Sequence, residues 1–492
     1  MNNVGKIWML TCLCLVWQTP VQAKVLSLSD VLSHVFAKSP DLQSSAVQVD
    51  MQRANSQQLD GALDMHYGAS AGLSNEIAPT TSPFAPTETN AAFIAGQAVQ
   101  PFINGSTLTA TVKYNRVGLI YPSSVISAFQ SKPNPQYQHQ IDLMYRYPLA
   151  AGSGNPNYTY QKEASLADEK AAKLRIALLK EQIAAQAIGM YAQFVLSDLS
   201  VKLAKDAELR ATQLLDNQKK RESFGLVEKA DRYQTEALVA ARKLQLAQAK
   251  ADKRAAQTAL NRLMYQDANT RLAVTFHSPH VQLAAVSKML EKAKSKRPIF
   301  KVLDAQYTAA EAQLNLTQAS SDYQLDLIGK VGTRALDGRA GTAFIQGFNP
   351  VHDRYIGISV EFSDVLNHQS SRGAVQKSVL VLESINIERH KAVLDLHTEI
   401  ATLLNDLRSA RITLKASKAQ VKAEKKKYHA EMERYQKGRT PTSMVIQFEG
   451  DLRAAQLREA IQRISLGVIK YKLALAVGEL PELVKLQGVG HE

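Results

Sequence analysis

The chain has 492 residues, 21% of them charged, and a formal net charge of +14 at pH 7. Such a charge can indicate nucleic-acid binding, but the densest basic run, residues 422–434, alternates with glutamates and has the pattern of a solvated helix face. We therefore expect no nucleic-acid partner. The only cysteines, Cys12 and Cys14, lie within the first 23 residues, so no disulfide is expected in the rest of the chain.

Residues 1–23 have the pattern of a secretory signal peptide. Lys6 supplies the positive start, residues 7–17 the apolar stretch, and Val21-Gln22-Ala23 the small-residue cleavage site. The apolar stretch is shorter than the ~20 residues that a membrane-spanning helix needs. We expect an exported chain that begins near Lys24.

The second half of the chain repeats the first. From Gly225 and Gly438 onward the two copies align without gaps at an offset of 213, and earlier segments match at an offset of 258, as Pro40 does with Pro298. The difference means that the first copy carries 45 more residues between its short leading helix and its long helices. A repeat of this length predicts a doubled architecture.

Each copy contains a long helical hairpin. Apolar residues spaced 3-4-3-4 from Val393 to Leu414 predict a helix that packs against another in the manner of a coiled coil. We expect long helices over about 160–223 and 375–436, each ended by a glycine that can adopt the left-handed cap, and return helices over about 228–265 and 442–477. Pro40 and Pro298 are each expected to begin a helix.

Period-two alternation between these helices predicts β-strands. The clearest segments are 107–114, 140–147 and 355–362, with 67–74 and 324–331 weaker. We expect two strands in each copy and four in the protomer; residues 92–99, paired with 108–114, would make six. Because no stretch after residue 23 resembles a membrane-spanning helix, insertion into a membrane would require a β-barrel. The alternative is a soluble two-layer sheet.

These elements predict a mainly α fold with a two-fold internal repeat, a long coiled-coil helical part and a β part. The boundaries we expect are a signal peptide at 1–23, a first repeat at 24–281 with its β segment at 66–150 and its hairpin tip at 225, a second repeat at 282–482 with its β segment at 323–365 and its tip at 438, and a tail at 483–492.

This combination resembles the TolC-like outer-membrane factors, the exit ducts of efflux pumps and type I secretion systems. The doubled tips, residues 224–231 and 435–443, and the closing segment 476–480 carry the resemblance. It implies a homotrimer whose strands close one barrel in outer-membrane lipid and whose helices form a periplasmic tunnel. It also implies docking of the tips onto a periplasmic adaptor that couples to an inner-membrane transporter, which would select the substrate.

Candidate functional residues follow from the same resemblance. The adaptor-contacting tips correspond to Gly225, Leu226, Val227, Gly438, Arg439 and Thr440. The pore constriction corresponds to Asp231, Gln234, Tyr435, Met444 and Gln447. Family members carry two acidic residues after the second tip, whereas this chain has Met444 and Gln447, which would narrow a pore by size and dewetting. The resemblance further implies a hydrogen bond from Tyr435 to Asp231 that helps to hold the closed state.

No catalytic constellation is present, so we expect neither an enzyme nor a cofactor. His277 and His280 flank a proline without nearby cysteine or carboxylate ligands, which argues against a metal site. The alternatives are a periplasmic coiled-coil adaptor, which would carry one hairpin flanked by compact β domains, and an enzyme with helical insertions. The doubled hairpins, each preceded by strands, favour the duct.

Overall fold

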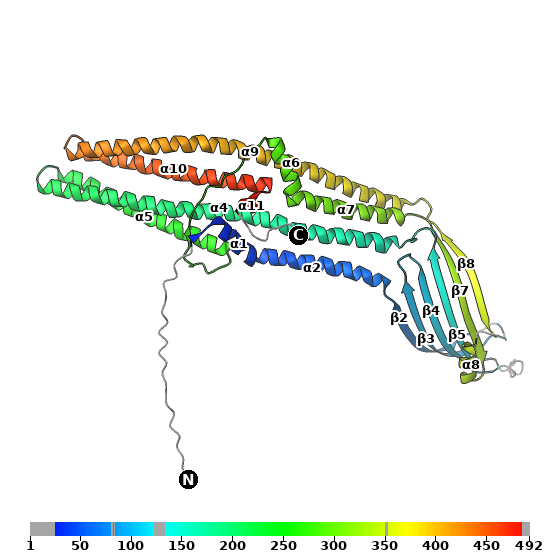
Figure 1. Cartoon of the computed structure of the whole chain (residues 1–492). Helices are drawn as coiled ribbons and strands as arrows, with labels where there is room; N and C mark the ends of the chain where they lie inside the picture. Colours follow the sequence, from blue (N-terminus) through cyan, green and yellow to red (C-terminus); the bar gives the residue numbers. More distant parts are fainter. Residues whose placement is uncertain (1–24, 80–81, 83, 123–132, 350–352, 485–492) are drawn as a thin grey trace, which may run out of the picture. The chain divides into compact units, whose positions relative to one another are not determined.

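The computed structural model describes residues 25–79, 82, 84–122, 133–349 and 353–484 (Figure 1). The predicted signal peptide and residues 485–492 of the predicted tail lie outside these ranges. Contacts divide the chain into two compact units, and each draws on both repeats. Unit 1 comprises Met1–Leu42, Leu179–Arg297 and Leu396–Glu492, and unit 2 comprises Gln43–Leu178 and Pro298–Asp395.

Two helices of 68 residues each dominate the chain. They are α4 (Pro156–Ser223) and α9 (Gln369–Gln436), and each is followed by a return helix, α5 (Lys229–Leu263) or α10 (Thr442–Val477). Within the 3-4 stripe of α9, Leu396, Ile400 and Leu407 are buried. The predicted long helices and return helices are therefore confirmed, as is the burial of the 3-4 stripe of apolar residues in α9.

The shorter helices begin where the sequence predicts. Helices α2 (Pro40–Asp60) and α7 (Pro298–Ala319) start at the two prolines, directly after α1 (Leu28–Lys38) and α6 (Val286–Lys296). Proline serves at a helix start because its missing N–H has no intrahelical partner there. In unit 1, β1 (Val25–Leu26) pairs in parallel with β6 (Ala273–Val274). Two further short elements are the 3-10 turn Gly61–Leu63 and α11 (Leu480–Leu483).

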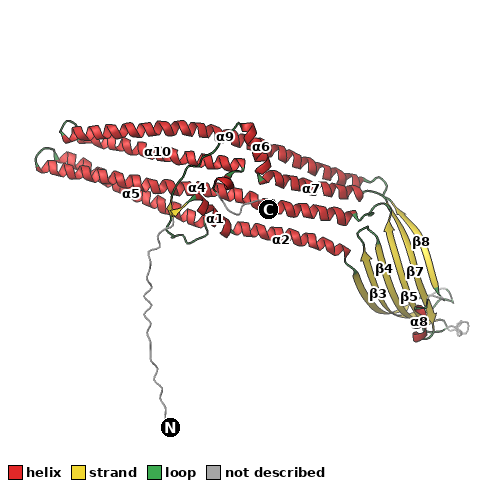
Figure 2. Ribbon diagram, in the orientation of Figure 1, coloured by secondary structure: helices red, strands yellow, loops and turns green. Residues whose placement is uncertain are grey.

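Unit 2 contains an antiparallel sheet of six strands in the order β2-β3-β4-β5-β7-β8 (Figure 2). The strands are β2 (His66–Ile77), β3 (Glu88–Pro101), β4 (Thr107–Ile120), β5 (Gln136–Pro148), β7 (Gln324–Asp337) and β8 (Arg354–Ser363). Our expectation of four strands is therefore wrong. The 45 extra residues of the first repeat supply a further hairpin, β3–β4. Strand β3 is rich in alanine, which weakens its apolar alternation.

The pairing register separates two chemically different faces of the sheet. Partners across an antiparallel pair lie on the same face, so one face can be followed from β2 to β8. What we call the apolar face carries, among others, Leu73, Ile94, Val112, Leu143, Val331, Ile356, Ile358 and Val360. The opposite, charged face carries Lys113, Asp142, Arg146, Asp326, Lys330, Arg334 and Glu361.

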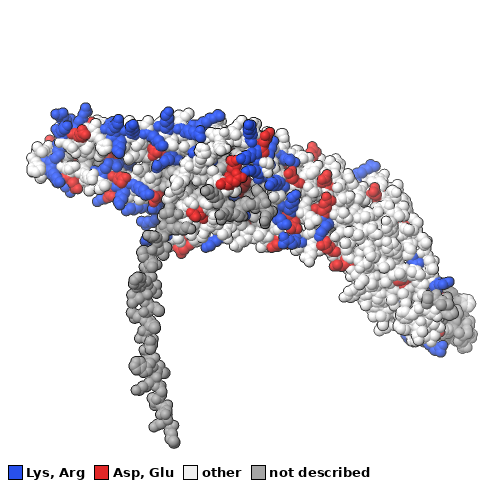
Figure 3. All heavy atoms as spheres, in the orientation of Figure 1, with Lys and Arg blue, Asp and Glu red and all other residues white. Residues whose placement is uncertain are grey.

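Ion pairs tie the strands together on the charged face. Arg146 reaches Asp326 at 2.7 Å and Glu361 at 3.0 Å, so one guanidinium links β5, β7 and β8. Figure 3 shows few charged side chains over the strands in that view, in contrast to the many over the helices. The sheet is therefore amphipathic, and these ion pairs lie on its charged face.

Helix α8 (Ala340–Gly347) covers part of the apolar face. Phe344 stacks on His139 of β5 with ring centroids 5.0 Å apart, and the Tyr114 hydroxyl of β4 donates to the Ala340 carbonyl at 2.9 Å. His139 is fully buried beneath this helix. No described helix has a stretch long and apolar enough to cross a bilayer.

The turn between β3 and β4 depends on Gly105. Its φ of +85° lies in the left-handed region, and a Cβ there would stand 2.1 Å from the Gly152 carbonyl oxygen. We predict that Gly105→Ala destabilises the sheet by at least ~1–2 kcal/mol, the cost of the left-handed region alone. Thermal unfolding followed by circular dichroism measures the change. Gly96→Ala in β3, where a Cβ meets nothing within 4 Å, is the control and should unfold close to the wild-type temperature.

Candidate functional site

The two hairpin tips share one backbone geometry. At the first tip Gly225 has φ +69°, its N–H donates to the Glu222 carbonyl at 2.8 Å, and the Leu226 N–H donates to the Arg221 carbonyl at 2.9 Å. At the second, Gly438 has φ +71° and makes the equivalent bond. This is the Schellman arrangement, which satisfies the last carbonyls of a helix. The predicted glycine caps are confirmed at both tips.

The tip residues are accessible in the protomer. Gly225, Leu226, Gly438 and Arg439 are exposed, while Val227 and Thr440 are half-buried. The Thr440 hydroxyl donates to the buried Glu431 carboxylate on the preceding helix, which holds the second tip against α9. Four of the six predicted adaptor-contacting residues are therefore exposed in the protomer, and their contact with an adaptor stays a prediction.

A buried polar chain crosses between the hairpins just inside the tips. The Tyr435 hydroxyl of α9 donates to the side-chain carbonyl of Gln218 on α4, and the Gln218 amide donates to the Thr442 hydroxyl of α10 at 3.4 Å. All three residues are at most 2% exposed. Because buried polar groups are costly when unpaired, these bonds fix the positions of three helix ends together.

The hydrogen bond expected between Tyr435 and Asp231 is not the one that the structure contains. Gln218 continues the buried 3-4 stripe of α4 and so faces Tyr435, whereas Asp231 is half-buried in the first turn of α5. The expectation of an aspartate partner is therefore wrong. Tyr435 is also held from outside, because Arg221 donates to its carbonyl at 2.8 Å and stacks 4.7 Å from its ring centroid.

Deeper in the same unit, a buried glutamate joins three helices. Glu449 of α10, 2% exposed, accepts from Arg210 of α4 at 2.9 Å and from the Nε of Arg242 of α5 at 3.0 Å. The Arg242 Nη2 makes a second bond to the same carboxylate oxygen. Hydrogen bonds between charged groups of this kind are shorter and roughly twice as strong as neutral ones.

Positive charge exceeds negative charge around Glu449. Burial lowers the pKa of Arg453, one turn further along α10, and the nearby guanidinium of Arg242 lowers it too. Burial also raises the pKa of the Tyr428 hydroxyl in this region. We call Arg210, Arg242, Glu449 and Arg453 the arginine–glutamate cluster. Its single carboxylate neutralises part of a charge that would otherwise separate the helices.

Apolar side chains from all four hairpin helices surround these polar groups. The buried members are Ala211, Leu214, Leu238, Val239, Tyr428, Tyr435, Val445 and Leu452. Packing of this kind makes the ends of the two hairpins one cooperative unit within the protomer.

The remaining constriction candidates do not meet one another in the protomer. Gln234 and Gln447 are exposed, and Asp231 and Met444 are half-buried at the starts of α5 and α10. Sequence reasoning missed Gln218 and Glu449. The available signal was their spacing, since Ala211, Leu214 and Gln218 follow a 3-4 stripe, as do Val445, Glu449 and Leu452. A polar residue in such a stripe indicates a specific buried partner.

Comparisons with known proteins identify the fold. No protein-family model and no curated protein matches the sequence. CusC, studied for its folding and transmembrane channel formation, matches with a TM-score of 0.68 at 13% identity, covering 93% of each chain. The Campylobacter jejuni CmeC outer membrane channel matches with a TM-score of 0.64 at 14% identity, over 92% of this chain and 86% of that one.

The Neisseria gonorrhoeae MtrE outer membrane channel, in its open state, matches with a TM-score of 0.64 at 14% identity, over 92% of this chain and 89% of that one. The likeness extends over nearly the full length of all three chains. This chain therefore has the fold of these outer-membrane channels.

The arginine–glutamate cluster gives a stability prediction. Glu449→Gln leaves the buried guanidinium of Arg242 and the half-buried guanidinium of Arg210 without their carboxylate, and should destabilise the protein by about 3–5 kcal/mol. Glu236, which aligns with Glu449 in the first repeat, has a 43% exposed side chain and pairs with Arg232 in solvent. Glu236→Gln is the matched control and should change stability by about 0.5 kcal/mol or less. Equal melting temperatures for the two variants would contradict the prediction.

Proposed function

We propose that this chain is a TolC-like outer-membrane factor: a passive exit duct of an efflux or type I secretion system, and not an enzyme. The observation that carries the proposal is the full-length match to outer-membrane channels, together with an amphipathic sheet whose apolar face can contact lipid. In this proposal the sheet lies in the outer membrane and the helices form a tunnel in the periplasm.

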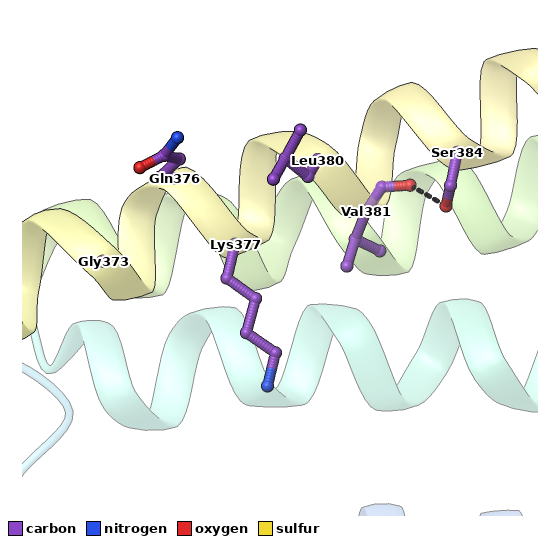
Figure 4. A pocket seen from close by; sticks show the side chains of 6 residues that line it. All are labelled: Gly373, Gln376, Lys377, Leu380, Val381 and Ser384. Carbon is purple, nitrogen blue, oxygen red and sulfur yellow. Dashed lines mark hydrogen bonds between the residues drawn. The ribbon is translucent and has the colours of Figure 1, made fainter.

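An uncovered helix face supports assembly into a homotrimer. Three turns of α9 line a shallow pocket of about 420 Å³ with Gly373, Gln376, Lys377, Leu380, Val381 and Ser384 (Figure 4). Leu380 is 54% and Val381 42% exposed. The exposed apolar side chains of Leu380 and Val381 suit burial against a second copy.

The tips are proposed to contact a periplasmic adaptor that couples to an inner-membrane transporter. Leu226 and Val227 at the first tip, and Arg439 and Thr440 at the second, follow the two glycine caps and lie at accessible turns. A trimer would present six such turns at one end. This arrangement supports a ring-shaped docking surface and leaves substrate choice to the transporter.

The tunnel end is proposed to open like an iris. In a trimer Asp231, Gln234, Met444 and Gln447 would form rings just inside the tips, with Tyr435 holding α9 in place behind them. Met444 and Gln447 carry no charge, so the constriction on the second hairpin would act by size and dewetting. The Tyr435–Gln218–Thr442 chain supports a closed state that is held by specific bonds.

Cell fractionation tests the proposed function. The protein should separate with the outer membrane and should run on gels as a trimer in detergent until it is heated. A periplasmic adaptor or an enzyme would instead be recovered without the outer membrane. Recovery as a soluble periplasmic monomer would overturn the proposal.

The closed state gives a second test. Tyr435→Phe removes the hydroxyl that bonds Gln218 and leaves a buried amide without its donor, at a cost of about 1–3 kcal/mol. We predict a higher single-channel conductance in planar bilayers. Tyr233→Phe is the matched control, because Tyr233 follows the first tip and is 56% exposed. Unchanged conductance in Tyr435→Phe would count against a role in closure.

A further inference from the structure

We propose that β2 of one protomer pairs with β8 of the next, so that three copies close one eighteen-stranded barrel. The inference rests on the trimer of the proposed function and adds its strand count, its closing edges and their register. The four strands first expected from the sequence would give twelve in a trimer. The six strands in the sheet give eighteen.

Both edge strands are unprotected. Strands β2 and β8 end the sheet, and neither contains proline or lysine to block pairing. Leu73 on β2 is 88% exposed and Ile356 on β8 is 75% exposed. Soluble proteins avoid long, flat, apolar edges, and unpaired backbone groups are not tolerated in lipid. The two edges therefore require partner strands.

The strand directions allow the two edges to pair with each other. All neighbours in the sheet are antiparallel, and six is an even number, so β2 and β8 run in opposite directions. When β8 meets β2 of the next copy, the contact is antiparallel as well. Every pair of neighbouring strands in the ring is then antiparallel.

The register within the sheet predicts where the edges meet. One row of partners crosses the six strands through His66, Val99, Thr109, Met144, Lys330 and Gly357. Strand β2 begins in this row at His66, whereas β8 continues six residues beyond Gly357 to Ser363. If the first residue of β2 in the next copy lies level with the last residue of β8, His66 of that copy lies opposite Ser363.

This offset agrees with the geometry of a membrane barrel. Six residues over six strands is one residue of stagger per strand. With a rise of ~3.4 Å per residue and a strand spacing of ~4.8 Å, the strands tilt by about 35°. Membrane barrels tilt by roughly 35–45°. The offset of six residues between the ends of β2 and β8 therefore gives a strand tilt that a closed membrane barrel can have.

The same register keeps the two faces in phase across the closing contact. With His66 opposite Ser363, Leu73 lies opposite Ile356 and Ala71 opposite Ile358, all on the apolar face. The apolar face, part of which is covered by α8, then points outward, and the charged face lines the lumen. Pairing shifted by one residue would place these side chains on the wrong side.

Closure by eighteen strands makes a wide lumen. At the same tilt, a barrel of eighteen strands has a backbone diameter of about 34 Å, against about 23 Å for twelve, since diameter grows nearly linearly with strand number. Barrels of 16–18 strands leave an aqueous channel. The strand barrel is thus not the narrow point, and selection by size falls to the hairpin tips.

Disulfide cross-linking tests the closing contact. Directly opposed residues on antiparallel strands have Cα atoms ~4.5–5.5 Å apart, which suits a disulfide. Oxidised Leu73→Cys/Ile356→Cys protein, boiled without reductant, should give covalent dimers and trimers that reductant returns to monomers. The two single variants, and Leu73→Cys/Val360→Cys four residues out of register, should stay monomeric.

The outcomes separate this inference from the proposed function. A cross-link at Ile358→Cys in place of Ile356→Cys supports the same closure with a larger stagger. Protein that runs as a trimer before heating but cross-links at neither position overturns the pairing, and covalent ladders beyond the trimer overturn the count of eighteen. Absence of the heat-sensitive trimer itself, in the reduced variants and the wild type alike, overturns the proposed function.

Discussion

Strands β2 and β8 form the two edges of the sheet. On its outer side, each has a row of backbone N–H and C=O groups that are not hydrogen-bonded to any described strand of the protomer. Helices satisfy their backbone internally, but a sheet can do so only by closing on itself or on a neighbour. Contact of the apolar face with water is unfavourable. In lipid, however, the unpaired backbone groups at the open edges would cost free energy. In the proposed duct, one closed barrel would therefore satisfy both the open strand edges and the apolar face.

The two repeats are complementary in the helical unit. Their tips share the same glycine cap and the same backbone bonds. Their buried charges differ, because Glu449 lies in the packed stripe of α10 whereas Glu236 pairs with Arg232 at the surface. The first repeat supplies Arg210 and Arg242, which bind the carboxylate of the second. Duplication provided the scaffold, and the two copies then acquired different roles at the same place.

Local pattern was enough to predict the helices, the proline starts and the tips, because periodicity and glycine chemistry act within a few residues. The strand count failed at β3, residues 88–101, where several alanines give little contrast between the two faces. The prediction of the hydrogen-bond partner of Tyr435 was wrong for another reason. Gln218 and Asp231 are both near the first tip in sequence, and only the rotation of α4 against α9 decides which one faces the tyrosine.

The arginine–glutamate cluster bears on how a duct of this kind could open. Glu449 binds α4 and α5 of the first hairpin from α10 of the second, and breaking a buried ion pair typically costs about 3–5 kcal/mol. An opening motion that separates the two hairpins of one protomer would have to break these bonds in every copy. Motion between copies, or bending confined to the tips beyond Tyr435, leaves the cluster intact. The energetics thus favour an iris in which the four hairpin helices of each protomer move together.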